Sequence, residues 1–247
     1  MKELALILFT ISVQVAIGIM VFAAIAKQLH KDGLFKTAVL TSAVLAIAGL
    51  LASFLHLGHP LSAINALTRF ATSWLSREIW FTSLFTGLTV LAALFIYFKP
   101  AAKSAVNLLV ILAAVIGLID VYAMASVYAS TSIEAWQHAA TFIEFYAAAL
   151  SMGSLIFFAL SAKEAPNLQK VVSIAVAAAI VVQAVGSFTA PQTMGAAMII
   201  KWAAILVGAG LLFLSGKKKE LGVSIVLGST ALVLLGQIVG RYIFFTL

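Results

Sequence analysis

Cysteine is absent from the 247 residues of this protein, and only 9% of the residues are charged. Without cysteine it can form no disulfide, and it can supply no thiolate to a zinc site or an iron–sulfur cluster. A soluble domain is about one quarter charged, so this protein lacks the polar surface that water solvates well. The shortage of charge therefore excludes an ordinary soluble protein.

Hydrophobic residues take the place of the missing charges. They make up 64% of the sequence, and the mean hydropathy is +1.16. A helix that crosses a bilayer needs about 20 mostly apolar residues. We predict an all-α integral membrane protein, a single membrane domain over residues 1–247, with eight transmembrane helices at residues 4–26, 37–57, 79–98, 104–127, 138–160, 171–190, 197–215 and 221–244.

The first segment has an alternative interpretation as a cleaved signal peptide, because Ala24-Ile25-Ala26 imitates a cleavage site. Its apolar run is longer than the roughly 7–15 residues of a signal peptide, and Glu3 offsets the charge of Lys2. We therefore expect this segment to be retained as a helix.

Lysine and arginine are divided unequally between the two sets of loops, ten on one side and five on the other. Positive charge is enriched in cytoplasmic loops, so we predict that both termini lie outside the cytoplasm and that the protein spans the cytoplasmic (inner) membrane. This orientation signal accounts for the net charge of +7, and we expect no nucleic-acid partner. The ten are Lys27, Lys31, Lys36, Lys99, Lys103, Lys163, Lys170, Lys217, Lys218 and Lys219.

The connection between the second and third segments concentrates polar residues. The stretch SFLHLGHPLSAINALTRFATSWLSREIWF, residues 53–81, holds two of the four histidines and two of the three arginines. We predict a short helix at about residues 61–71 that lies in the plane of the outer membrane surface. Ser76, with Glu78 close behind, resembles a helix start, where a carboxylate meets the positive end of the helix dipole. His56 has no such structural explanation, and a buried imidazole needs a partner.

Further ionisable residues approach the same membrane face from other segments. Asp120 and Glu144 lie roughly 10 Å inside at the helical rise, and we expect each to have a partner or a proton. Lys201 and Arg241 lie near the membrane surface, where a long side chain either reaches water or serves a function. Gln237 precedes Arg241 by one helical turn.

Three motifs together resemble the membrane-anchor subunit of dimethyl sulfoxide reductase and its relatives. HLGHP followed by SWLSREI matches the family's H-L-G-x-P turn and its S-x-L-S-x-E-I entry into the next helix. LLGQIVGRYIFF resembles the family's last helix, and VYASTSIEAW resembles an outer connection. The family has an acidic residue where this protein has Gln237.

The resemblance implies an enzyme subunit of anaerobic respiration that oxidises menaquinol, or another quinol, near the outer face. It implies two partners there, a ferredoxin-like iron–sulfur subunit that takes the electrons and a molybdopterin subunit that reduces the terminal acceptor. The anchor itself would carry no acceptor-reducing site, no metal and no iron–sulfur cluster. The resemblance assigns catalysis to His56 and Glu78, and we expect quinol to be bound by His56, Glu78, Arg77, Arg241 and Gln237.

Two other interpretations stay open. A haem-bearing cytochrome b also oxidises quinol, and His56 could pair with His138 as iron ligands, with His59 as a substitute. A proton-coupled secondary transporter would use Asp120 and Glu144 to carry protons, although the segments show no matching breaks at the midplane.

Overall fold

The computed structural model describes residues 2–30, 33–56, 67–189, 195–215 and 223–246. In this part of the sequence eight α-helices are long and apolar enough to span a membrane, which confirms the all-α fold and the predicted number of spans. The long helices are α1 (Lys2–Leu29), α2 (Lys36–His56), α4 (Trp74–Phe98), α5 (Lys103–Ala129), α6 (Ala139–Ser161), α7 (Gln169–Thr189), α8 (Ala196–Ser215) and α9 (Val223–Phe245). Two short 3₁₀ helices, η2 (Glu134–Trp136) and η3 (Pro166–Leu168), lie in connections.

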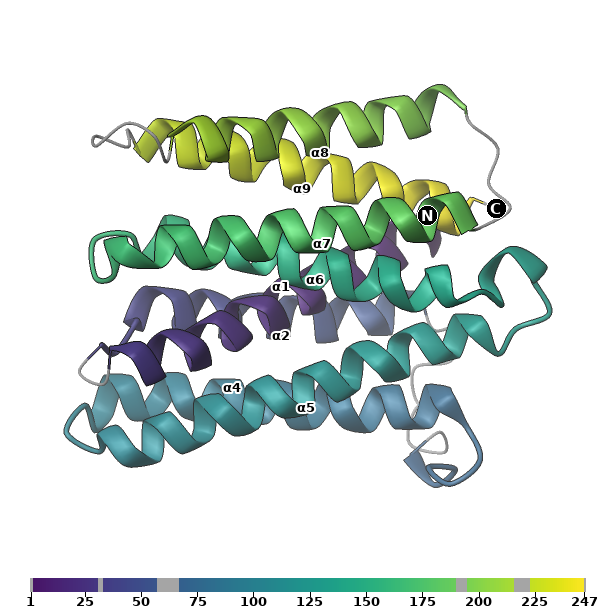
Figure 1. Cartoon of the computed structure of the whole chain (residues 1–247). Coiled ribbons are helices and arrows are strands. Elements are labelled where there is room, and N and C mark those ends of the chain that lie inside the picture. The colour runs from purple at the N-terminus through teal and green to yellow at the C-terminus, as the bar shows by residue number, and fades with distance from the viewer. Residues whose placement is uncertain (1, 31–32, 57–66, 190–194, 216–222, 247) are drawn as a thin grey trace.

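The eight helices run up and down side by side, so both termini lie at the same end of the bundle (Figure 1). We call this the termini end; there α1, α4, α6 and α8 begin, and α2, α5, α7 and α9 end. At the opposite end lie Lys36, Lys99, Lys103, Lys163 and Lys170, and we call it the lysine-rich end.

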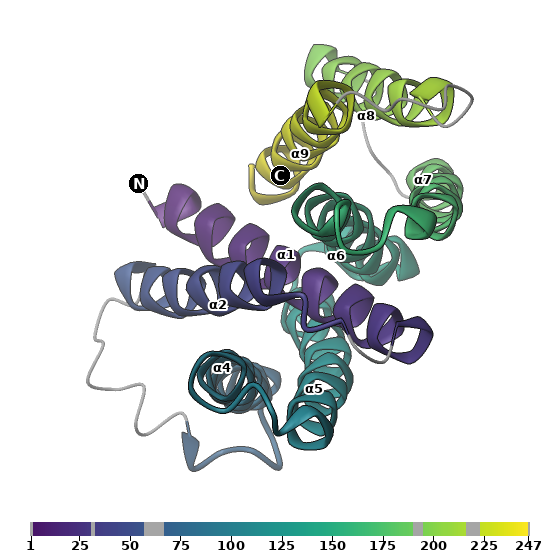
Figure 2. The same cartoon turned by 90° about the vertical axis from the view of Figure 1, so that its left-hand side faces the viewer.

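Sequential helices pack as antiparallel pairs, α1 with α2, α4 with α5, α6 with α7 and α8 with α9. Figure 2, viewed along the bundle, shows α1 in the middle, between the α4–α5 pair and the α6–α7 pair. The α8–α9 pair lies at one edge, where α9 packs on α6 and α1. Large apolar side chains such as Leu40, Val44 and Leu51 face outward, as a lipid-facing surface requires.

Helices α1 and α6 approach closely at two glycines. A Cβ atom on Gly153 would overlap the backbone of Gly18, and one on Gly18 would overlap the backbone of α6 at Ala149. Small residues allow this close approach of transmembrane helices. The crossing fixes α6, which carries Glu144, against the central helix.

The connection before α4 differs in part from the prediction. Of the expected interfacial helix, residues 61–66 lie outside the described residues, while Leu67 is helical and residues 68–72 form turns. The predicted helix start at Ser76 is wrong, because Ser73 is the N-cap and its hydroxyl accepts a hydrogen bond from the Ser76 N–H at 3.4 Å. Glu78 therefore lies inside α4 instead of at its first turn.

Candidate functional site

Two carboxyl groups are buried between α4 and α5, in a group that we call the acid centre (Glu78, Thr82 and Asp120). Glu78 is 5% exposed and Asp120 is 0% exposed. The Thr82 hydroxyl lies 3.0 Å from Oδ1 and 2.9 Å from Oδ2 of Asp120 and donates to that carboxyl. Oε1 of Glu78 is buried without a hydrogen-bond partner among the described residues.

The spacing of residues along α4 produces this arrangement. Glu78 and Thr82 are four residues apart, so they occupy the same face of the helix, the one that packs on α5. Glu78 lies about 6 Å from the start of α4, and Asp120 lies about 14 Å from the end of α5, at the helical rise. Both acids are thus nearer to the termini end than to the lysine-rich end.

Arg77 does not join the acid centre. Its guanidinium is turned to the surface, where it donates to the carbonyl oxygens of Phe70 at 3.0 Å and Ala71 at 2.7 Å and lies 4.2 Å from the centre of the Trp74 ring. These contacts tie the turn before α4 to the helix, and they give Arg77 a structural role.

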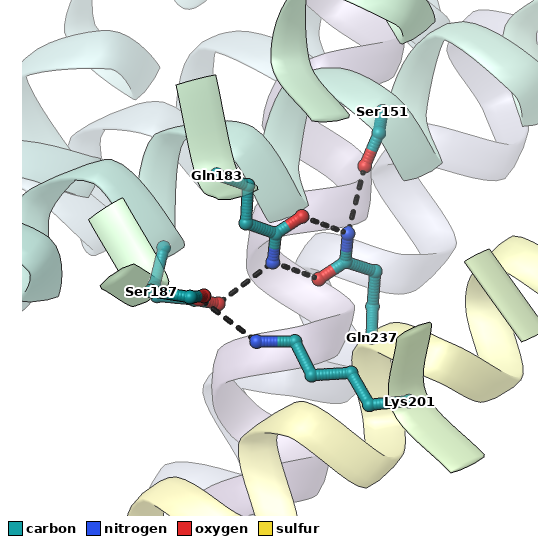
Figure 3. Close-up of polar contacts among 6 residues, drawn as sticks. Ser151, Gln183, Ser187, Lys201 and Gln237 are labelled. Atoms are coloured by element: carbon teal, nitrogen blue, oxygen red, sulfur yellow. Dashed lines mark hydrogen bonds and ion pairs between the residues drawn. The ribbon is translucent and has the colours of Figure 1, made fainter. Parts of the chain in front are cut away.

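A second polar group joins α6, α7, α8 and α9, and we call it the amide network (Glu144, Ser151, Gln183, Ser187, Lys201 and Gln237; Figure 3). Lys201 donates to Glu144 at 2.8 Å, and Ser187 donates to the same carboxylate at 3.1 Å. Gln183 donates to Glu144 at 2.7 Å and to Gln237 at 3.0 Å. Gln237 donates back to Gln183 at 2.9 Å and to Ser151 at 3.2 Å.

Arg241 lies beside this network, where it lines the same small pocket as Glu144, and its guanidinium contacts an amide and aromatic rings. It is 4% exposed, its Nη2 donates to Oε1 of Gln14 at 2.9 Å, and its guanidinium lies 3.8 Å from the centre of the Phe145 ring. Its Nε has no hydrogen-bond partner within the described residues. Arg241 and Lys201 are both buried, so neither side chain reaches out to water from the membrane.

The space around these charges is small. A pocket of about 10 Å³, room for about one water molecule, is lined by Glu144, Met198, Lys201, Gln237, Gly240, Arg241, Ile243 and Phe244. A larger hollow of about 400 Å³ lies on α6 and α7, where apolar side chains line it apart from Tyr146, whose hydroxyl donates to the Leu118 carbonyl. Of these two hollows, the small pocket is the one that brings charged side chains together.

An aromatic cluster lies beside Arg241, whose guanidinium is 3.8 Å from the centre of the Phe145 ring and 5.5 Å from the centre of the Phe244 ring. Tyr128 is 8% exposed and packs against Trp136, Phe145, Phe244 and Phe245. Both Glu78 and Arg241 interact electrostatically with Tyr128. Of the residues expected at the quinol, Glu78 belongs to the acid centre, Gln237 belongs to the amide network, and Arg241 lines the small pocket beside that network.

The histidines are described only in part. His56 is the last residue of α2, at the termini end, but its side chain and the whole of His59 lie outside the described residues. His138 directly precedes α6, and its Nε2 is buried without a hydrogen-bond partner in the described part of the sequence. The pairing of His56 with His138 stays a prediction.

Comparison with known proteins identifies the family. The family model "DMSO reductase anchor subunit (DmsC)" matches residues 1–247. The protein belongs to this family.

Two named relatives support this assignment, and their matches cover different shares of the protein. A component of the anaerobic dimethyl sulfoxide reductase of Haemophilus influenzae is 32% identical over 173 residues, which cover 68% of this protein and 61% of that relative. The anaerobic dimethyl sulfoxide reductase component YnfH of Escherichia coli is 25% identical, and the match covers 99% of this protein and 94% of YnfH. The match to the Haemophilus protein thus spans less than two thirds of that protein's length.

In this member of the family, the sequence analysis did not identify two polar partners of the carboxyl groups. Thr82 and Gln183 were not singled out, although each contacts a buried carboxyl. A signal for Thr82 was present, because Glu78, Thr82 and Thr86 recur every four residues and so form a stripe along one helix face. A similar signal was present for Gln183, because Ser187 follows it by four residues and both side chains donate to Glu144.

Proposed function

We propose that this protein anchors an iron–sulfur subunit and a molybdopterin subunit to the cytoplasmic membrane and supplies them with electrons by oxidising menaquinol. The family assignment and the multi-pass fold support the anchoring role. The names of the relatives, components of anaerobic dimethyl sulfoxide reductases, support a place in an anaerobic respiratory complex. The termini end faces away from the cytoplasm in this proposal and carries the partners.

The observation that carries the quinol assignment is the carboxyl of Glu78. It is buried about 6 Å inside the termini end of α4, and one of its oxygens has no partner among the described residues. A buried polar atom without a partner is uncommon and often marks a functional site. His56 ends α2 at the same end of the bundle, and α2 packs on α4.

Quinol oxidation breaks two O–H bonds and releases two electrons and two protons. In our proposal His56 accepts the proton of one hydroxyl and Glu78 accepts the proton of the other, before both protons pass to water at the termini end. A histidine titrates near neutrality and suits this role. The electrons leave to an iron–sulfur cluster of the partner, since the anchor has no cysteine to hold a cluster.

The remaining residues that were expected at the quinol have other contacts. Arg77 holds the turn before α4, Gln237 belongs to the amide network, and Arg241 lines the small pocket beside it. The proposal therefore rests on His56 and Glu78, and it gives Arg77, Gln237 and Arg241 supporting structural roles.

Glu78→Gln tests the proposal in the complete complex. The amide keeps the size of the side chain but does not accept a proton, so turnover with a quinol donor should fall by about 10²–10⁴-fold. Turnover with an artificial donor that reduces the iron–sulfur subunit directly should be unchanged. Glu134→Gln is the matched control, because Glu134 is an exposed carboxylate at the same end. Equal quinol turnover in both variants would overturn the role of Glu78.

A further inference from the structure

The acid centre contains more acceptors than donors. Its two carboxyl groups offer four oxygen atoms, and the Thr82 hydroxyl, with a single proton, is the one side-chain donor to them that the described residues provide. Oε1 of Glu78 is left without a donor among those residues. Buried hydrogen-bond acceptors without donors are unfavourable, so the acid centre lacks at least one hydrogen-bond donor.

The acid centre also lacks a positive charge. No ion pair to Glu78 or Asp120 occurs among the residues that the structure describes, and the charged group that acts on Asp120 there is another acid, Glu78. Glu144 shows the contrast within the same protein, since its carboxylate pairs with Lys201 at 2.8 Å. Two neighbouring carboxylates in an apolar environment cannot both stay ionised.

We propose that Glu78 and Asp120 share one proton at rest and hold two protons for a short time during each turnover. A proton on this pair supplies the missing donor, because a protonated carboxyl has an O–H group. The inference rests on the proposed function, since it makes quinol the source of the second proton. Asp120 is a positioning residue in this scheme, and Glu78 is the group that meets the substrate.

The proton balance is complete. Before quinol oxidation the pair carries one proton and one negative charge. When the quinol is oxidised, one of its protons goes to His56, the other goes to Glu78, and the two electrons go to the partner's iron–sulfur cluster. The pair is then neutral, and it returns to its resting state when Glu78 releases a proton to water at the termini end.

The surroundings of the acid centre leave one direction for proton release. Asp120 is the deeper of the two acids, and beyond it the buried face of α5 continues with Gly117, Ala114, Ala113, Val110 and Val106. On α4 the buried face continues with Thr86, Thr89, Ala92 and Ile96. These side chains do not ionise, so the pair exchanges protons through Glu78 with the termini end. Among the described residues, Tyr128 on α5 is a further titratable group that interacts with Glu78.

Infrared spectroscopy of the whole complex in lipid tests the shared proton without relying on turnover. At neutral pH the wild type should show the carbonyl band of a protonated, buried carboxylic acid, with a shift in D₂O. Asp120→Asn and Glu78→Gln should each remove or shift this band. Glu144→Gln should leave it in place, because Glu144 is paired with Lys201 and does not belong to the acid centre. Thr82→Val removes only the hydroxyl donor and should shift the band, which gives a second test if Asp120→Asn does not assemble.

Quinol-driven turnover of the acid-centre variants distinguishes the shared proton from the proposed quinol site. Asp120→Asn should lower quinol-driven turnover by about tenfold or more, below the 10²–10⁴-fold loss of an acid–base group itself, and should leave artificial-donor turnover unchanged. The shared proton is wrong if no such band exists. It is also wrong if Asp120→Asn leaves both the band and quinol-driven turnover intact while Glu78→Gln abolishes turnover, and in that case the proposed quinol site stands. If the band responds as expected but neither acid affects quinol turnover, the acid pair stands and the proposed quinol site is wrong.

Discussion

At the scale of single residues, Lys201 shows how a charge is kept inside the bundle. Its ammonium group donates to Glu144, and the same carboxylate accepts from Gln183 and Ser187. An ionised side chain inside a membrane is costly unless it is paired and hydrogen-bonded. The two glutamines, which donate to each other, fix the geometry around the pair, so α7, α8 and α9 are joined through buried polar side chains.

Removing only one partner of this ion pair should be strongly destabilising. Lys201→Met leaves the partly buried Glu144 carboxylate without its ion-pair partner, and breaking a buried pair in this way costs about 3–5 kcal/mol. The double variant Lys201→Met/Glu144→Gln removes both charges and should recover much of that loss. Thermal unfolding of the purified protein in detergent measures all variants, with Glu144→Gln as the third corner of the cycle. Additive losses in the double variant would show that the two charges do not stabilise each other.

The sequence indicated which charged side chains inside the membrane need a partner, but not which residues are their hydrogen-bond or ion-pair partners. Asp120 and Glu144 were expected to have a partner or a proton, and both have hydrogen-bond partners. For Lys201 and Arg241 the sequence left two alternatives open, a side chain that reaches water and a side chain with a functional role. Depth in the membrane alone does not decide between them. Gln183 and Gln237 are 54 residues apart in the sequence, and only the packing of α7 beside α9 brings them together.

At the scale of helices, apolar length predicted the spans well because hydrocarbon thickness sets it directly. The predicted span 104–127 corresponds to α5, Lys103–Ala129. The largest error is at α4, which begins at Trp74 instead of residue 79. Residues 74–78 include Arg77 and Glu78, which hydropathy assigns to a loop, whereas the structure caps the helix at Ser73 and buries Glu78 within it.

The close crossing of α1 and α6 predicts an unequal response of two glycines. Gly153→Ala places a methyl group against the backbone of Gly18, so α1 and α6 must separate, and overpacking of this kind costs about 1–3 kcal/mol. Gly210→Ala is the matched control, because no atom lies within 4 Å of the added Cβ on α8. The thermal midpoint in detergent should fall for Gly153→Ala only. Equal thermal midpoints for the two variants would mean that α1 and α6 lie farther apart at Gly153 than the structure shows.

At the scale of the whole molecule, eight spans place both termini at the same end of the bundle (Figure 1). The fold alone does not set which end faces the cytoplasm. The division of lysine and arginine between the loops, ten to five, sets the expected orientation. The acid centre then opens toward the side on which the partners are proposed to dock.

Reporter fusions test this orientation. A reporter placed after Leu247 should be active outside the cytoplasm, and one inserted after Lys219 should be active inside it. The opposite pattern would reverse the bundle and move the proposed quinol site to the cytoplasmic face.

The central claim is that this protein oxidises quinol at the termini end through His56, and paired donor assays of two histidine variants test it most directly. His56→Phe keeps a ring of similar bulk and removes the proton acceptor, and His59→Phe does the same three residues later. We expect His56→Phe to assemble and to keep full turnover with an artificial donor, while its quinol-driven turnover falls by about 10²–10⁴-fold. In His59→Phe the quinol-driven turnover should fall much less. Full quinol-driven turnover in assembled His56→Phe would contradict the account.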